Sequence, residues 1–398
     1  MAMGQREVVG QTVTSAESVF ARDRPLYLES ESGKIDRYPR NVWLRWGLRL
    51  VAALPFVSVA VWFHLASGGN WDGTANGALA ERVSTLPWGS SDVAALAELY
   101  PIISSVAALI IPGGAFGLGV AGALVGGLLI QLTIQSMQRK EFPFPVRIVF
   151  ILTLALTPMF AYVVTTSFEA ALGLTFFGLG MIDLVRFVTY ANTQAGFRAG
   201  LLFACSALSD FTGLFVAMVA AIAAALIVRS RAASRLANAI VVVFPTLALL
   251  GSLMVLGVAF RLGPLAMIRG DLHWDTARAA DVAQFLATPS GVLYLVPTAV
   301  VVLTAIVLRY PGVGAVAPLM TAMILLAYIV GLTPPGLAGI NYLLMLLLAV
   351  AVVPKPTTVT MVAVVCATSV ILWGIGWAQA FDNDTVSAWM HVLTGGAR

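Results

Sequence analysis

Apolar runs of about 20 residues recur along almost the whole chain, and polar residues are confined to the short stretches between them. Clear examples are 47–66, 148–165, 236–260 and 359–378. A run of about 20 apolar residues is what an α-helix needs to cross a bilayer. A transmembrane barrel would instead alternate apolar and polar residues in segments of about 10, and no such alternation is present. The sequence therefore predicts an all-α, polytopic transmembrane helical bundle with about 11 spans.

Composition supports this class and excludes others. Only 11% of the residues are charged and 59% are hydrophobic, whereas soluble domains carry roughly 25% charged residues. The basic residues lie at the ends of the apolar runs, so no nucleic-acid surface is expected. Cys205 and Cys366 lie inside apolar runs and are expected to be small buried side chains rather than a disulfide or a metal site.

Charges at the ends of the runs predict the topology. Arginines at 37, 40, 45 and 49 precede or open the first span, and the positive-inside rule places that end in the cytoplasm. We expect a cytoplasmic tail over 1–46, a helical domain over 47–378 and an external tail over 379–398, in the inner (plasma) membrane. The first 45 residues contain no apolar stretch of the kind found in signal peptides, so we expect the first span to act as an uncleaved insertion signal. The long polar segments 67–98 and 261–290 are the predicted external loops.

Two apolar stretches carry internal breaks. Residues 99–137 are interrupted at Pro112-Gly113-Gly114, and they form either one kinked crossing or two short ones. Residues 200–228 are interrupted around Asp210, which predicts two short helices that meet there. The glycine-rich segment 113–127 predicts close packing between helices. No inverted repeat of the kind common in transporters is visible.

Two acidic residues are the leading catalytic candidates. Asp72 lies in Asn70-Trp71-Asp72-Gly73, just after the first span, where a carboxylate can act as a general base, bind a cation or form an Asx turn. Glu169 lies at the external end of a later span, where it is either a solvated cap or a paired acid. We expect the two carboxylates to converge beside a water-filled pocket at the outer face.

The second external loop holds further candidates. Arg261, Arg269 and Arg278 lie outside the membrane against the usual bias, so they are candidates to hold an anionic group such as a phosphate. His273 has acids on both sides, but this spacing is a weak signal for a metal. No phosphate-binding loop, dinucleotide fingerprint or catalytic serine motif is present.

Acids inside the apolar runs support a different function. Asp210 is a candidate intramembrane acid or a helix cap at a break. Asp183 and Arg186 are three residues apart and are expected to pair near the cytoplasmic end. A secondary transporter or lipid flippase would depend on these residues, and a non-catalytic membrane subunit would depend on none of them.

Several motifs resemble those of a known family. Trp71-Asp72 and Leu99-Tyr100-Pro101 resemble the Trp-Asp and Leu-Tyr-Pro motifs of the mannosyltransferases related to GPI-anchor assembly, which have the GT-C fold. Thr157-Pro158-Met159-Phe160, Phe168-Glu169 and Leu184-Val185-Arg186 are similar to the region of that fold where a Pro near the outer face precedes a second external acid. Leu201 to Gly213 is similar to the helix pair that follows.

The resemblance implies a GT-C glycosyltransferase that moves a sugar from a polyprenyl-phosphate donor to a glycan, lipid or protein acceptor at the outer face. It implies that Asp72 is the catalytic base and Glu169 an accessory acid, with a divalent cation as an open possibility. The expected substrate-binding residues are Trp71, Glu98, Tyr100, Arg261, Arg269 and His273. The sequence departs from the pattern at Thr74-Ala75-Asn76, where the family has an aromatic residue.

Overall fold

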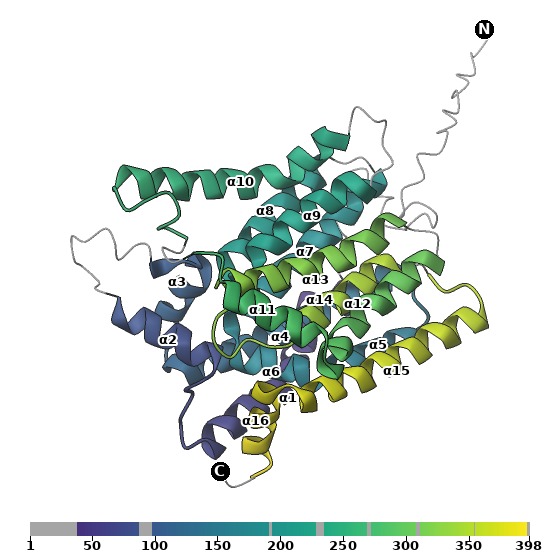
Figure 1. Ribbon diagram of the computed structural model, residues 1–398. Coiled ribbons are helices and arrows are strands. Elements are labelled where there is room, and N and C mark those ends of the chain that lie inside the picture. The colour runs from purple at the N-terminus through teal and green to yellow at the C-terminus, as the bar shows by residue number, and fades with distance from the viewer. Residues whose placement is uncertain are drawn as a thin grey trace.

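The computed structural model describes residues 38–86, 98–190, 193–227, 235–268, 272–307, 311–353 and 355–395. These residues form helices and no strand. Figure 1 shows the helices in one bundle, with several of the longer ones running side by side. The helices are α1 (Val42–Ala66), α2 (Ala75–Thr85), α3 (Ile102–Ile110), α4 (Gly114–Arg139), α5 (Phe144–Ala155), α6 (Pro158–Thr166), α7 (Phe168–Tyr190), α8 (Thr193–Ser209), α9 (Gly213–Ile227), α10 (Arg235–Ala259), α11 (Thr276–Leu286), α12 (Pro289–Val307), α13 (Pro311–Ile329), α14 (Ile340–Val352), α15 (Val359–Asp382) and α16 (Asp384–Leu393).

Within the described ranges, six helices are long and apolar enough to cross a membrane: α1, α4, α7, α10, α12 and α15. A seventh candidate is the pair α5 and α6, which together are long enough but bend by 56° at their junction. Pro158 begins α6, and a proline is favourable at the first position of a helix but cannot continue the preceding one. The all-helical, membrane-compatible bundle that the sequence predicts is thus confirmed at this coarser level.

The two predicted breaks are present. Gly113 takes a left-handed conformation with φ 92°, which glycine adopts without steric cost. Helix α3 ends at Ile110, and Gly113 is the N-cap of α4. Residues 99–137 therefore contain one short helix and most of one long helix. The break at Asp210 separates α8 from α9, as predicted.

Glycines let α4 approach its neighbours closely. A Cβ on Gly119 would lie 2.8 Å from the Thr165 carbonyl oxygen, and one on Gly126 would lie 2.8 Å from Val164. A Cβ on Gly122 would collide with the Val164 carbonyl oxygen. The prediction of close packing along 113–127 is confirmed, with α6 as the partner on this face.

We expect Gly122→Ala to lower the stability of the bundle by about 1–3 kcal/mol, because the added methyl group meets backbone that cannot move alone. The matched control is Gly251→Ala in α10, where nothing lies within 4 Å of the new Cβ. That variant should be neutral or slightly stabilising. Unfolding in mixed detergent micelles measures both, and equal midpoints would contradict this account of the packing.

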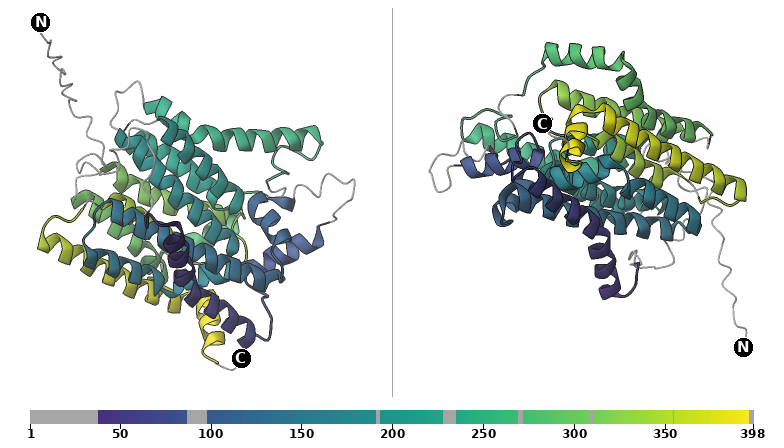
Figure 2. Two further views of the ribbon diagram at one scale, coloured as in Figure 1. Left: turned by 180° about the vertical axis from the view of Figure 1, so that it is seen from behind. Right: turned by 90° about the horizontal axis from the view of Figure 1, so that it is seen from below.

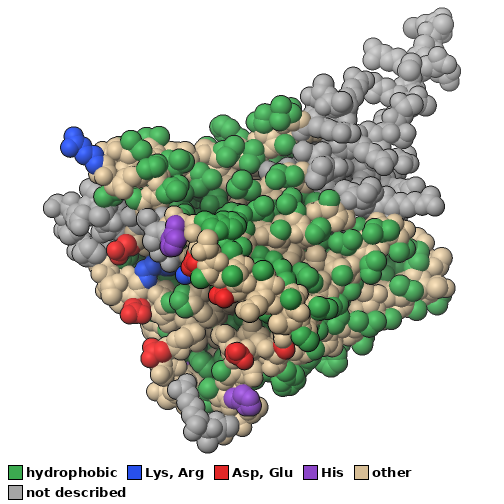
Figure 3. Space-filling model, in the orientation of Figure 1, with side chains coloured by type: hydrophobic (Ala, Val, Ile, Leu, Met, Phe, Trp, Pro, Cys, Tyr) green, Lys and Arg blue, Asp and Glu red, His purple; other side chains and the backbone are tan. Residues whose placement is uncertain are grey.

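Short helices gather at one end of the bundle, which we call the polar end: α2, α3, α11 and α16. Figures 1 and 2 show them at the same end of the long helices, and α10 extends away from the bundle beyond its contacts with α8 and α9. Helix α4 starts beside α2 and α3 and runs 26 residues, or roughly 39 Å. In Figure 3 the visible acidic side chains lie toward this end, and the flank along α15 is apolar.

Basic residues mark the opposite end. Lys140 follows α4, and its Nζ donates to the Val350 carbonyl at 2.9 Å. Lys355 pairs with Glu141 at 2.6 Å. Asp183 pairs with Arg186 at 2.8 Å, as predicted, and also with Arg198 at 3.2 Å. The bundle is therefore asymmetric in charge along its long helices.

Candidate functional site

The loop after α1 is fixed to the start of α7 by a buried amide. Asn76, in the first turn of α2, is fully buried. Its Nδ2 donates to the Thr165 carbonyl at 3.0 Å, and its Oδ1 accepts from the Phe168 N–H at 2.7 Å. Buried polar groups stabilise a fold when both their donors and acceptors are satisfied. Asn76 therefore fixes α2 against the break between α6 and α7.

One helical turn and a half further along α2, a salt bridge makes a second link. Arg82 Nη2 lies 2.5 Å from Glu169 Oε1, and the Glu169 side chain is only 2% exposed. Ser104 Oγ donates to the same carboxylate oxygen at 3.2 Å, and Arg82 donates to Ser105 Oγ at 3.2 Å. Glu169 lies in the first turn of α7, where the helix dipole also favours a negative charge.

Three more residues, Tyr100, Asp210 and Thr212, complete this group, which we call the Glu169 cluster. Tyr100 is buried and donates to the Ala207 carbonyl at 2.7 Å, and its ring meets Phe211 edge-on at 5.5 Å. Asp210 is buried in the turn between α8 and α9 and accepts a hydrogen bond from Thr212. The cluster consists of Arg82, Tyr100, Ser104, Ser105, Glu169, Asp210 and Thr212.

Burial dominates the electrostatics of Asp210. Loss of hydration, with a smaller contribution from the Glu169 charge, raises the pKa of Asp210 from 3.8 to about 7, against the opposing hydrogen bonds from Thr212. Asp210 Oδ1 is buried without a hydrogen-bond partner among the described residues. Burial also raises the pKa of Tyr100 above its ordinary value.

This environment predicts a pH dependence of stability. The folded-state pKa of Asp210 exceeds the unfolded value, so its favourable contribution is complete below about pH 4 and is lost as the pH rises toward 7. The slope is roughly 1.4 kcal/mol per pH unit. Asp210→Asn should therefore gain stability relative to the parent between pH 5 and 8. The free energy of unfolding of the parent and of Asp210→Asn, measured at pH 5 and at pH 8, gives this gain. The control is Glu81→Gln, since Glu81 is an exposed acid. A pH-independent difference would contradict it.

Asp72 has a different environment from Glu169. Its side chain is exposed, and no hydrogen bond or ion pair within the described residues uses its carboxylate. Asn70 forms the Asx turn, because its Oδ1 accepts from the Asp72 N–H at 2.6 Å, and Thr74 caps α2. Glu169 is instead buried and paired with Arg82, so the expected convergence of the two carboxylates beside a water-filled pocket stays a prediction.

Trp71 orients the residue next to it. The indole is buried, and its Nε1 donates to His64 Nδ1 at 3.1 Å. It meets Phe63 edge-on at 4.9 Å and packs against Gly119. Trp71 thus anchors the loop that joins α1 to α2 by packing against both α1 and α4. The next residue, Asp72, lies at the surface.

The other predicted substrate-binding residues are dispersed. Glu98, Arg261 and His273 are exposed, and Arg261 has a left-handed backbone at φ 59° just after α10. Arg269 lies outside the described residues. Arg278 pairs with Asp275 at 3.4 Å. Within the described part of the chain, no group of three or more His, Cys, Asp or Glu side chains could hold a metal.

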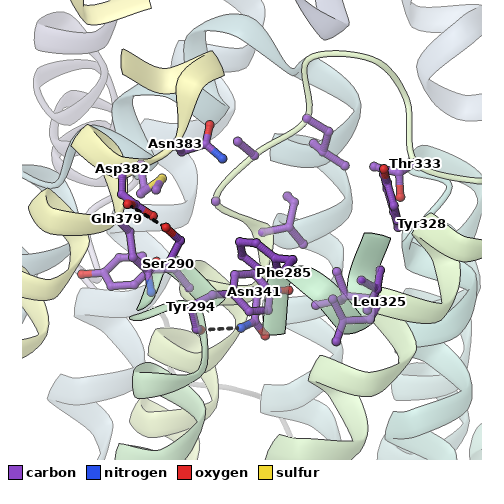
Figure 4. Close-up of a pocket in the computed structure, with 18 of the residues that line it drawn as sticks. Phe285, Ser290, Tyr294, Leu325, Tyr328, Thr333, Asn341, Gln379, Asp382 and Asn383 are labelled. Atoms are coloured by element: carbon purple, nitrogen blue, oxygen red, sulfur yellow. Dashed lines mark hydrogen bonds between the residues drawn. The ribbon is translucent and has the colours of Figure 1, made fainter. Parts of the chain in front are cut away.

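A cavity of about 640 Å³ opens at the polar end, between α11, α12, α13, α14 and α15. Figure 4 shows Asn341, Tyr294, Ser290 and Gln379 around it. Asp281, Asp382 and Asp384 also line it, and so does Thr212 of the Glu169 cluster. The volume lies within the range of roughly 300–1,000 Å³ of known ligand sites.

One loop connects this cavity to Asp72. Residues 333–339 belong to the segment that joins α13 to α14, and four of them line the cavity: Thr333, Leu337, Ala338 and Gly339. Gly336, at φ +73°, abuts the Gly73 carbonyl and the Thr74 backbone so closely that a Cβ there would collide with them. The Gly336 carbonyl accepts from Tyr162 Oη at 2.5 Å. The loop that carries Asp72 therefore packs against the segment that forms one wall of the cavity.

Sequence reasoning did not identify Arg82, Asn76 or the 333–339 loop. Arg82 lies in a polar loop and resembles a solvated residue, and its partner is 87 residues away. The Thr333-Pro334-Pro335-Gly336 stretch carries a turn signal, but a turn signal does not show what the turn contacts.

Comparisons of the chain with protein-family models, with curated proteins and with solved structures find no match.

Proposed function

We propose that this chain is an integral membrane glycosyltransferase that moves a sugar from a polyprenyl phosphate to an acceptor. The supporting observation is the placement of Asp72. Its carboxylate is exposed and makes no hydrogen bond or ion pair within the described residues. The helix that follows it, α2, is fixed to the start of α7, and the neighbouring Gly73 packs against the loop at the cavity wall. A general base needs an accessible carboxylate on a rigid support, within reach of a bound substrate.

The proposed reaction follows from this placement. Asp72 takes the proton from an acceptor hydroxyl, whose oxygen then attacks the anomeric carbon of the donor sugar. The bond from that carbon to the phosphate oxygen breaks, and the polyprenyl phosphate leaves with its negative charge. The proposed partners of that phosphate are Arg261 and Arg278, at the same end, and Arg269, which lies outside the described residues.

Glu169 takes a different role from the one that the family resemblance implies. Its carboxylate is buried and paired with Arg82, so it is a positioning residue that holds α2 and hence Asp72. This role needs no contact between Glu169 and the substrate.

The membrane topology is part of the proposal. We propose that the shorter helices α8, α9, α13 and α14 also cross the membrane, which together with the six long helices and the bent pair α5 and α6 would give the 11 predicted spans. Basic residues, Lys140 and Arg186 among them, lie at the end of the bundle opposite the polar end. The positive-inside rule assigns that basic end to the cytoplasm. The N-terminus is then cytoplasmic, and the cavity opens on the outer face of the plasma (inner) membrane.

A transporter is the second candidate, and one observation favours it. Asp210 is a buried acid with a raised pKa and an unpartnered oxygen, which are properties of proton-linked carriers. Asp183 and Arg186, the other two residues on which a transporter would depend, lie at the opposite end of the bundle and form an ion pair with each other.

The purified protein in liposomes distinguishes the two candidates. The vesicles are supplied with a labelled polyprenyl-phosphate hexose, mannose first, and with an extract of host membranes as the acceptor source. Glycosyl transfer is shown by label that moves from the lipid into a product stable to mild acid. Label that crosses the bilayer while the donor remains intact would support the transporter instead.

A further inference from the structure

The charged side chains that line the cavity at the polar end are all acidic. Its carboxylic acids are Asp281, Asp382 and Asp384, and the described residues that line it include no Lys, Arg or His. A phosphate or a sugar acid that enters the cavity would meet these three carboxylates and no cationic side chain among the described lining residues. An anionic ligand is therefore disfavoured here, and the phosphate of a polyprenyl donor would be held elsewhere.

The uncharged groups of the lining are of the kind that bind hydroxyl groups. Asn341 and Gln379 lie at the buried inner side of the cavity, and Ser290, Thr288 and Thr333 add hydroxyls. Ser290 Oγ donates to Asp382 Oδ1 at 2.9 Å (Figure 4), which leaves the other carboxylate oxygen to accept from a ligand. Carboxylates and amides each accept hydrogen bonds from hydroxyls, and the amides also donate.

Aromatic rings form the walls between these polar groups. Phe285, Tyr294, Tyr328 and Tyr342 line the cavity, and Phe285 and Tyr294 meet edge-on at 5.8 Å. Flat rings provide apolar area for the C–H faces of a sugar, while nearby polar groups hold its hydroxyls. The three acids do not converge into a metal site in the described structure, which favours an organic ligand over a bound cation.

We infer that this cavity binds an uncharged saccharide, and that this saccharide is the acceptor of the transfer reaction. The second part rests on the proposed function, whereas saccharide binding itself does not. The loop 333–339 contributes to both sites, because Thr333 and Leu337 line the cavity and Gly336 contacts Gly73 beside Asp72. A saccharide that is bound in the cavity and extends past this loop would bring one of its hydroxyl groups within hydrogen-bond reach of Asp72.

Binding to the purified protein in detergent tests the inference without any transfer assay. Saturation-transfer NMR and calorimetry are run with neutral mannobiose, maltose and trehalose, and with the matched pair glucose and glucuronate. A neutral sugar should bind, and glucuronate should bind at least about tenfold more weakly than glucose at low ionic strength. Added salt should reduce that difference.

Two variants locate the site. Thr333→Trp fills the cavity and should abolish binding, whereas Thr385→Trp, at an exposed position of α16 outside the lining, should leave it unchanged. Asp281→Asn removes a rim charge, so it should narrow the preference for glucose over glucuronate. Circular dichroism and unfolding check that Thr333→Trp is folded. A misfolded Thr333→Trp leaves the Asp281→Asn result to decide.

The outcomes separate the two proposals. Saccharide binding that Thr333→Trp abolishes, without sugar transfer in liposomes, keeps the cavity assignment and removes the transferase. Transfer without measurable saccharide binding, or binding that both the Thr333→Trp and Asp281→Asn variants leave unaltered, overturns the cavity assignment alone. Equal or tighter binding of glucuronate also overturns it.

Discussion

Replacement of Asp72 by asparagine is expected to lower the rate of sugar transfer by about 100-fold or more, which is the typical contribution of a general base. The change removes the ability to take a proton but keeps the size of the side chain. Because the Asp72 carboxylate is exposed and makes no hydrogen bond within the described residues, the substitution should not disturb the fold.

The measurement is the initial rate of label transfer in liposomes, at equal protein content and with unchanged unfolding midpoints. Glu81→Gln is the matched control, since Glu81 is another exposed acid and lies in α2, the helix that directly follows the Asp72 loop. It should retain the parental rate. A rate for Asp72→Asn within a few-fold of the parent would remove Asp72 from the mechanism.

A further comparison separates chemistry from binding. Loss of a base lowers kcat and leaves the KM for the donor nearly unchanged, because the proton moves only in the transition state. A rise in KM with an unchanged kcat would instead indicate that Asp72 holds a substrate hydroxyl. Either result differs from the loss of stability that a purely structural residue would cause.

The sequence predicts the parts of this fold that depend on local patterns. Apolar runs identify the membrane-compatible helices, and Gly113 and Asp210 identify two breaks, because helix propensity and burial in lipid act on neighbouring residues. The glycines of α4 predict close packing for the same reason. The Asp183–Arg186 pair is a spacing of three along one helix.

The site depends on contacts between distant segments, which no local pattern encodes. Arg82 and Glu169 are 87 residues apart, and Gly336 meets Gly73 from the far half of the chain. The sequence does not show the partner of Glu169, because Arg82 lies in a distant polar segment that forms α2. The expected meeting of Asp72 and Glu169 assumed that two acids at one face share one site, whereas in the structure Glu169 pairs with Arg82.

Removal of Arg82 is expected to be the most destabilising single change in the Glu169 cluster. Arg82→Met leaves the Glu169 carboxylate, which is 2% exposed, without its cation, and loss of one partner of a buried pair typically costs about 3–5 kcal/mol. Glu169→Gln should cost less, because Arg82 remains 23% exposed and can be hydrated. Ser104 Oγ can still donate to the glutamine oxygen.

The double variant Arg82→Met with Glu169→Gln provides the decisive comparison. If the pair interacts as the 2.5 Å distance indicates, the double variant should be more stable than the sum of the single effects predicts. Unfolding in mixed detergent micelles measures all four proteins, with Arg261→Met, an exposed arginine at the same end, as the control. Additive effects would mean that the pair contributes no coupling.

The same variants test whether Glu169 acts through the position of α2. Displacement of α2 moves the loop that carries Asp72, so both single variants should lower transfer even where the protein remains folded. Restored stability in the double variant should restore part of the rate, because an uncharged contact between the two substituted side chains can hold α2 on α7 without leaving a buried charge unpaired. A catalytic Glu169 would give the opposite pattern, in which every variant that lacks the carboxylate is inactive however stable it is.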